Sequence, residues 1–212
     1  HDLFGSDYAG RIPGQLVAHV LYFYTKPGDV VIDPMGGSGT TPDVCLFMGR
    51  KCYAYDVNDK IERPDVIKHD MATGWPERTK KADLIFWDPP YYKKADIGKL
   101  GPDGLGYVDG SISKMEQGEY LEFFSQRFKE AHTMVKKGTI MAFLMSHWLD
   151  FENPEDSIFI WDYIDLMKRA SWSVVRDIQC PLTTQQVRAT TVLHHRETRE
   201  LSCLTRNLII AE

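Results

Sequence analysis

The feature that most constrains the fold is an apolar run that ends abruptly in polar residues. The run and its end read Leu84-Ile85-Phe86-Trp87-Asp88-Pro89-Pro90-Tyr91. Four consecutive large apolar side chains are typical of a central strand of a parallel sheet, which helices cover on both faces. Open sheets of this kind bind ligands at the carboxyl ends of their strands. We therefore expect Asp88 and the residues after it to lie at a ligand site.

The turn after this strand is stiff because it contains two prolines. Pro89 and Pro90 fix their own φ angles and hold the residues before them in an extended conformation. The Asp88 carboxylate and a backbone carbonyl beside it can accept both hydrogens of one planar amino group, and the Tyr91 ring can lie against a flat heterocycle. The turn therefore predicts a receptor for an exocyclic amine. A proline-terminated strand with a packed tyrosine is the alternative interpretation.

A second strand ends in a glycine-rich turn earlier in the chain. The strand over residues 30–32 leads into Asp33-Pro34-Met35-Gly36-Gly37-Ser38-Gly39-Thr40-Thr41, and we expect a helix over residues 42–48. Glycines let the backbone approach a ligand, and a helix N-terminus offers free N–H groups. The third glycine of G-x-G-x-x-G is absent, and Asp33 would repel a pyrophosphate but attract a cation. S-adenosylmethionine, which carries an ammonium and a sulfonium, therefore fits better than a dinucleotide; a tight turn without a ligand is the alternative.

Acidic residues also follow the next two expected strands, over residues 52–55 and 66–68. Asp56 stands about 20 residues after the glycine-rich turn, where an acid can accept from both ribose hydroxyls of a nucleoside. Its alternative role is to cap a short helix at residues 57–59. Asp70 could accept the adenine amino group of the same ligand, and a capping or turn role is equally compatible with its position.

The remaining apolar patterns predict an alternation of helices and strands. Helices are expected over residues 16–24, 119–136 and 158–170, and strands over residues 139–145, 172–178 and 208–210. Between them, the stretch from Tyr92 to Glu119 is rich in glycine and contains Lys93, Lys94 and Lys99. Long loops beside an active site are often lids or substrate-binding elements, so we expect Tyr92 and these lysines to contact substrate. A solvated loop without a function is the alternative.

Composition limits the classes of protein that the chain can represent. Its 212 residues, 43% of them hydrophobic, suit one domain, and a formal net charge of -5 argues against coating nucleic acid electrostatically. The four cysteines show no C-x-x-C spacing, so reduced thiols in the cytoplasm are expected rather than zinc or disulfides. We find no apolar run of membrane length and no signal peptide. Because the chain begins with His1, we expect it to be a piece of something longer.

Taken together, the two turns resemble the motifs of the amino-group DNA methyltransferases that use S-adenosylmethionine. The first turn is similar to D-P-F-x-G-S-G-T-T, with Met35 in place of Phe, and the second matches D-P-P-Y. The segment from Arg11 to Gln15 resembles the element that precedes the cofactor strand in this family, and the resemblance extends to about Trp148. It implies a Rossmann-like methyltransferase fold, with a mostly parallel seven-stranded sheet and an antiparallel C-terminal strand. One departure from the family concerns domains: the residues after Trp148 are taken up by a helix and the last strands, so we expect a single catalytic domain over residues 1–212, without a separate target-recognition domain.

The resemblance implies a role for each matching residue and implies no metal. Four residues are implied to be catalytic: Asp88, Pro89, Pro90 and Tyr91. S-adenosylmethionine is implied as the cofactor, held by Gln15, Asp33, Pro34, Met35, Gly36, Gly37, Ser38, Gly39, Thr40, Thr41, Asp56, Asp70 and Met71.

The resemblance also indicates a reaction. D-P-P-Y is more usual in the family for adenine than for cytosine amines, so it implies methyl transfer to N6 of an adenine flipped out of DNA onto Tyr91, as in restriction-modification. The alternatives are methylation of cytosine N4 in DNA, methylation of guanine N2 in RNA, and an inactive partner subunit that only binds the cofactor. A recognition domain or partner subunit is expected to supply sequence specificity.

Overall fold

The computed structural model describes residues 4–6, 11–59, 61, 63–92, 111–150, 152–181 and 205–212. Its helices are α1 (Gly14–Tyr24), α2 (Thr40–Phe47), α3 (Gln117–Met134) and α4 (Ile160–Arg169), and its short 3-10 helices are η1 (Met71–Thr73), η2 (Glu77–Lys81), η4 (Ile112–Lys114) and η5 (Pro154–Asp156). Its strands are β1 (Val30–Asp33), β2 (Lys51–Asp56), β3 (Val66–Lys68), β4 (Leu84–Trp87), β5 (Ile140–Met145), β6 (Val174–Pro181) and β7 (Thr205–Ala211). No helix in these ranges is long and apolar enough to cross a membrane.

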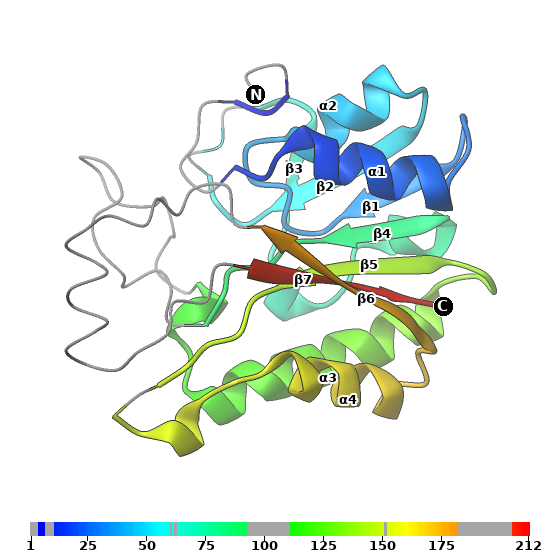
Figure 1. Ribbon diagram of the computed structural model, residues 1–212. Coiled ribbons are helices and arrows are strands. Elements are labelled where there is room, and N and C mark those ends of the chain that lie inside the picture. The colour runs from blue at the N-terminus through cyan, green and yellow to red at the C-terminus, as the bar shows by residue number, and fades with distance from the viewer. Residues whose placement is uncertain are drawn as a thin grey trace.

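The strands form one seven-stranded sheet in the order β3-β2-β1-β4-β5-β7-β6. Neighbouring strands from β3 to β5 pair in parallel, whereas β7 pairs antiparallel with both β5 and β6. Figure 1 shows α1 and α2 on one face of the sheet and α3 and α4 on the other. The expectation of a mostly parallel sheet with an antiparallel C-terminal strand is therefore confirmed.

The order of strands places the two conspicuous turns next to each other. From β1 the chain moves to β2 on one side of the sheet, and it later returns to β4 on the other side of β1. In the register of this pair, Val31 lies beside Leu84 and Ile32 beside Ile85. The turns that follow β1 and β4 consequently leave the same edge of the sheet at the point where the strand order reverses, which is the usual ligand site of such folds.

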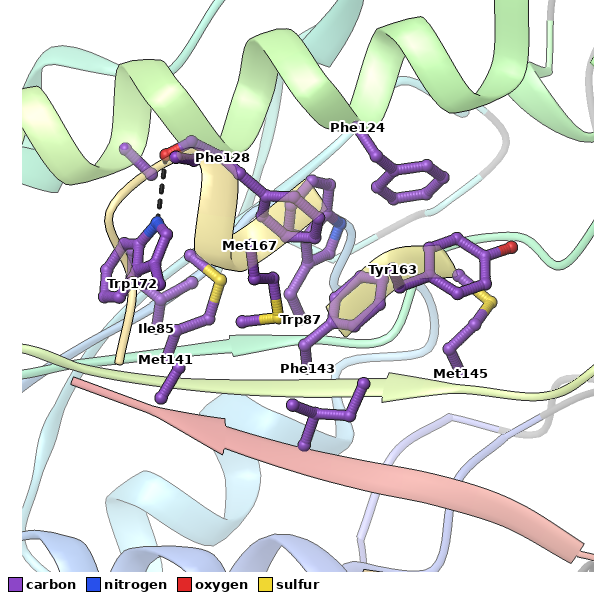
Figure 2. Close-up of a cluster of buried hydrophobic side chains, with 14 of the residues drawn as sticks. Ile85, Trp87, Phe124, Phe128, Met141, Phe143, Met145, Tyr163, Met167 and Trp172 are labelled. Carbon is purple, nitrogen blue, oxygen red and sulfur yellow. Dashed lines mark hydrogen bonds between the residues drawn. The ribbon is translucent and has the colours of Figure 1, made fainter. Parts of the chain in front are cut away.

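Two hydrophobic layers hold this edge in place. Leu84 and Phe86 of β4 pack in the layer that includes residues of α1 and α2, and Ile85 and Trp87 pack in the layer that includes residues of α3 and α4. The Trp87 ring lies at the centre of the second layer, with its centroid 5.3 Å from that of Phe143 (Figure 2). Buried side chains on both faces are what the continuous apolar run of β4 predicts.

The boundaries of several elements differ from those that the sequence predicts. The helix after the glycine-rich turn begins at Thr40 rather than residue 42, because Gly39 adopts φ 81° and turns the backbone into the helix there. The last strand begins at Thr205 rather than residue 208, because the polar residues Arg206 and Asn207 pair with β6 and extend it. Residues 57–59 form a bend and a turn instead of the short helix.

Candidate active site

Three aspartates stand at the carboxyl ends of adjacent parallel strands. Asp33 ends β1, Asp56 ends β2, and Asp88 comes directly after β4. Asp33 alternates along its strand with Ile32, and it lies on the same face as Val31, which packs under α1 and α2. The charges of Asp88 and Asp56 both act on Asp33 and raise its pKa. The three carboxyl groups thus form one acidic cluster at the edge of the sheet.

Asp33 is the most perturbed member of this cluster. Burial raises its pKa from 3.8 to about 7, and the neighbouring charges of Asp88 and Asp56 add to the effect. The nearby Thr41 hydroxyl and the Met35 N–H, which donates to Oδ1 at 3.1 Å, lower it in part. A buried carboxyl with a raised pKa should bind a cation favourably, because a nearby positive charge stabilises its ionised form.

The glycine-rich turn packs closely against β2. The Gly36 N–H donates to the carbonyl oxygen of Tyr55 at 2.7 Å, and a Cβ added at Gly36 would lie 3.1 Å from the Cβ of Ala54. Gly37 and Gly39 adopt φ angles of 47° and 81°, in the left-handed region that favours glycine. At Gly37 an added Cβ would meet no atom within 4 Å, so this side of the turn is open to an approaching group.

Asp56 joins the same turn to the end of β2. Its Oδ2 accepts a hydrogen bond from the Gly37 N–H at 2.9 Å, and its Oδ1 accepts one from the Asn58 N–H at 2.9 Å. Burial raises the pKa of Asp56, and these backbone hydrogen bonds offset part of the rise. Each carboxylate oxygen has a second lone pair, so both can accept a further hydrogen bond. The arrangement is compatible with a pair of ribose hydroxyls.

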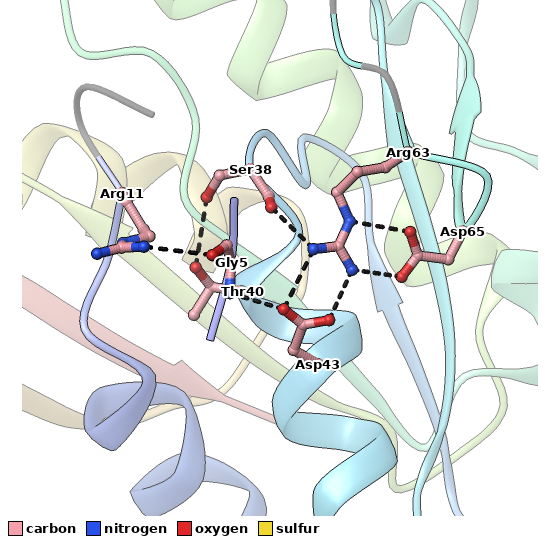
Figure 3. A network of polar contacts seen from close by, with 7 residues as sticks. All are labelled: Gly5, Arg11, Ser38, Thr40, Asp43, Arg63 and Asp65. Atoms are coloured by element: carbon pink, nitrogen blue, oxygen red, sulfur yellow. Dashed lines mark hydrogen bonds and ion pairs between the residues drawn. The ribbon is translucent and has the colours of Figure 1, made fainter. Parts of the chain in front are cut away.

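An arginine that the sequence analysis did not single out clamps the outer side of the turn (Figure 3). The Arg63 guanidinium pairs with Asp43 of α2 at 2.6 Å and with Asp65 at 2.6 Å, and its Nη1 donates to the carbonyl of Ser38 at 3.3 Å. A Cβ added at Gly39 would lie 2.4 Å from the Arg63 Cζ. The turn is therefore held from both sides, by Asp56 on one and Arg63 on the other.

The turn after β4 is anchored from α3. The Tyr120 hydroxyl donates to the carbonyl oxygen of Pro90 at 2.9 Å, and the Tyr91 hydroxyl donates to Asp88 Oδ1 at 3.1 Å. Burial raises the pKa of Tyr91, followed by the effect of the Asp88 charge, so its hydroxyl stays protonated and acts as a donor. Arg206 of β7, which the sequence analysis did not single out, is buried nearby: burial lowers its pKa, whereas the Asp88 charge and Tyr91 raise it.

The predicted cofactor residues outside the glycine-rich turn and Asp56 are Asp70, Met71 and Gln15. Asp70 is exposed and caps η1, since its Oδ1 accepts from the Ala72 N–H at 2.8 Å, as the capping alternative expected. Met71 is buried in the core beneath it, and Gln15 is exposed in the first turn of α1. That these three residues contact one cofactor molecule stays a prediction.

The expected substrate contacts need one correction. Tyr92 is only 2% exposed, and its ring packs against that of Tyr120 with centroids 5.0 Å apart. It is part of the hydrophobic core, so we remove it from the candidate substrate-binding residues. Lys93, Lys94 and Lys99 lie outside the described residues.

Cys45, Cys52 and Cys180 are free thiols, and Cys203 lies outside the described ranges. In the part of the chain that the structure describes, no group of three or more histidine, cysteine or acidic side chains could hold a metal ion.

The N-terminal part of the chain is similar to known sequences. Residues 4–68 match a family model described as DNA methylase, of the N6 and N4 type. The chain is 34% identical over 65 residues to the DNA adenine methyltransferase YhdJ of Escherichia coli, which is 28% of this chain and 22% of that protein. It is 29% identical over 98 residues to the type II methyltransferase M.MjaII of Methanocaldococcus jannaschii, which is 42% of this chain and 18% of that protein. The match therefore spans about a fifth of the length of these relatives.

Solved structures extend the likeness to nearly the whole chain. TrmN from Thermus thermophilus aligns with a TM-score of 0.55 and 16% identity, over 96% of this chain and 50% of that one. A S-adenosylmethionine-dependent methyltransferase from Clostridium acetobutylicum aligns with a TM-score of 0.54 and 10% identity, over 94% and 89%. At these identities the likeness establishes the fold. The chain thus has the Rossmann-like fold of methyltransferases, and its N-terminal part is similar to the amino-group DNA methyltransferases, whose cofactor is S-adenosylmethionine.

Proposed function

We propose that the chain transfers a methyl group from S-adenosylmethionine to the exocyclic N6 amine of an adenine in DNA. The observation that carries the proposal is the adjacency of β1 and β4, which brings the glycine-rich turn and the Asp88-Pro89-Pro90-Tyr91 turn to one edge of the sheet. One turn suits a cationic nucleoside and the other suits an amino group. A methyl donor held by the first would therefore face an acceptor held by the second.

The residues around the first turn fit S-adenosylmethionine. Asp33 would stabilise the positive end of the molecule, because it is a buried carboxyl whose ionisation a cation would favour. Asp56 would accept from the ribose hydroxyls through the lone pairs that Gly37 and Asn58 leave open. Gly37 leaves space for close approach of the ligand to the backbone. When bound, the cofactor supplies an electrophilic methyl group.

The second turn would prepare the amine for attack. An exocyclic amine is a poor nucleophile because its lone pair is delocalised into the ring. When the Asp88 carboxylate and the Pro89 carbonyl accept its two N–H bonds, the nitrogen can pyramidalise and direct its lone pair at the methyl group. This is catalysis by positioning and electrostatics, without a protein nucleophile. In the transfer, the amine nitrogen would bond to the methyl group, the demethylated cofactor would be the leaving group, and the surplus proton on nitrogen would pass to solvent.

Adenine is the proposed base, and DNA the proposed polymer. The D-P-P-Y motif and the similarity to a protein named as a DNA adenine methyltransferase support this choice over cytosine N4. Similarity to the type II methyltransferase M.MjaII supports a place in restriction-modification. We propose residues 1–212 as one cytoplasmic catalytic domain, with sequence specificity supplied by a further domain or a partner subunit.

The test is methyl transfer from isotopically labelled S-adenosylmethionine to DNA and RNA, followed by chromatography of the released nucleosides. The expected product is N6-methyladenine in DNA. Asp88→Asn should abolish most of the transfer, whereas the matched change Asp165→Asn, at an exposed position of α4, should not affect it. Label on cytosine or in RNA would show that the proposed substrate is wrong and would identify the correct one. No transfer to any nucleic acid, with cofactor binding intact, would contradict the proposed activity.

A further inference from the structure

A buried arginine reaches the catalytic turn from the far end of the sequence. Because β7 is antiparallel to β5 and β6, it begins at the edge where the parallel strands end. Arg206 alternates with Asn207 and lies on the same face as Leu208, which packs in the layer under α1 and α2. Phe86 of β4 packs in this layer too, two residues before Asp88. The topology therefore directs Arg206 and Asp88 to one face of the sheet at one edge.

The surroundings of Arg206 are unusual for a surface arginine. The residue is only 6% exposed, and its Nε has no hydrogen-bond partner among the described atoms. A buried guanidinium is costly unless it is paired with an opposite charge. The charge of Asp88 and the Tyr91 hydroxyl, together with the nearby Cys180 thiol, favour the charged form of Arg206, whereas burial opposes it.

These neighbours connect Arg206 to the catalytic carboxylate. The Tyr91 hydroxyl, which favours the charged form of Arg206, donates to Asp88 Oδ1 at 3.1 Å. Asp88 also lies close enough to Asp33 for the two charges to repel. Arg206 brings a positive charge that acts on Asp88. Because a nearby positive charge favours the ionised form of a carboxyl, loss of this charge would shift Asp88 toward its protonated form.

We propose that Arg206, acting together with the Tyr91 hydroxyl, is a positioning residue that keeps Asp88 ionised and oriented as the acceptor of the substrate amine. The inference rests on the proposed function and deepens it. A protonated Asp88 would carry a hydrogen on one oxygen and compete with the amine as a donor. A rotated Asp88 would no longer align with the Pro89 carbonyl. Arg206 acts through Asp88 and Tyr91, and the substrate itself is not among its contacts.

The test compares three variants of the full chain. Arg206→Met removes the charge and keeps the length of the side chain, Arg206→Lys keeps the charge, and Tyr91→Phe removes the bridging hydroxyl. We expect Arg206→Met to lower kcat by at least about tenfold and to move the acid limb of the pH–rate profile upward by about one pH unit. Arg206→Lys should restore the position of the acid limb, and Tyr91→Phe should shift it in the same direction as Arg206→Met. Binding of S-adenosylmethionine, measured by calorimetry, should change by less than about twofold in all three.

The possible outcomes separate the inference from the proposed function. An unchanged acid limb in both Arg206→Met and Tyr91→Phe would overturn the inference, even if kcat falls. Equal losses of kcat in Arg206→Met and Arg206→Lys, without a shift, would also overturn it and assign Arg206 a purely structural role. Should the wild-type chain lack methyl transfer, the proposed function fails. In that case, the inference can be tested without substrate by following the titration of the aspartate carboxyls with carbon-13 NMR. The titration of Asp88 in Arg206→Met is compared with that in the wild type and in Arg206→Lys. An unshifted titration in Arg206→Met would refute the inference.

Discussion

Replacing Asp33 with asparagine is expected to change stability and cofactor affinity in opposite directions. On folding, the pKa of Asp33 rises from 3.8 to about 7, chiefly because burial removes the carboxylate from water. A difference of about three pKa units corresponds to roughly 4 kcal/mol, at about 1.4 kcal/mol for each unit. The residue is only 3% exposed, so solvent screens the effect little.

The sign follows from proton binding. Because the folded pKa lies above the unfolded pKa, the folded protein binds this proton more tightly than the unfolded chain. The free energy of unfolding should therefore fall as the pH rises from about 4 to about 7, and it should not recover above that range. Asp33→Asn removes this titration and can still accept from the Met35 N–H. The variant should match the wild type near pH 4 and exceed its stability at pH 8 by up to roughly 4 kcal/mol.

Urea denaturation of both proteins from pH 4 to pH 8 measures the effect, and the relevant quantity is the difference between the two curves. Asp165→Asn, at an exposed ion pair of α4, is the control for a change of charge. Parallel curves for wild type and Asp33→Asn would refute the reasoning. The affinity for S-adenosylmethionine should respond in the opposite way: in the wild type it should be about tenfold weaker at pH 6 than where Asp33 is fully ionised. In Asp33→Asn the affinity should be weaker and independent of pH over this range.

Three further changes test the remaining parts of the site and its support. Asp88→Asn should lower turnover by at least about 10²-fold while calorimetry shows nearly unchanged cofactor binding, because a preorganised electrostatic partner is lost. Asp56→Ala should weaken cofactor binding by about 1.5–3 kcal/mol in the same assay, and a smaller loss would exclude it as a ligand to the ribose. Phe143→Ala should lower the free energy of unfolding by about 3–5 kcal/mol in urea, because it opens a cavity against the fully buried Trp87; a loss below about 1 kcal/mol would show that the core collapses onto the gap.

The sequence predicts the fold well because its strands carry strong local signals. The apolar run of β4 and its proline-terminated end require a central strand, and the glycine-rich turn after β1 requires a strand-to-helix junction. The boundaries are less predictable, since they depend on backbone conformation. The positive φ of Gly39, which begins α2 two residues earlier than predicted, is one example.

The parts of the site that sequence reasoning missed are side chains that act across long distances in the chain. Arg63 stands in a polar stretch without a motif, and only the folded chain brings it to Asp43 and across Gly39. Arg206 lies in the last strand, more than a hundred residues after the turn that it contacts. Tyr92 shows the opposite error. Its place beside the catalytic motif indicates a substrate contact, but packing against Tyr120 buries it.

The placement of charge divides the sheet edge into two functional halves. Within the described residues, the polar groups that act on Asp33 and Asp56 as donors are backbone N–H groups and, at Asp33, the Thr41 hydroxyl, and no basic side chain is among them. Asp88, in contrast, faces the guanidinium of Arg206. A carboxyl that lacks a counter-charge interacts most favourably with a cationic ligand. A carboxylate that already has an arginine beside it interacts most favourably with a neutral hydrogen-bond donor such as an amine. The half formed by β1 and β2 therefore suits a cationic methyl donor and repels a pyrophosphate, whereas the half formed by β4 and β7 suits a neutral donor such as the amine of the proposed substrate.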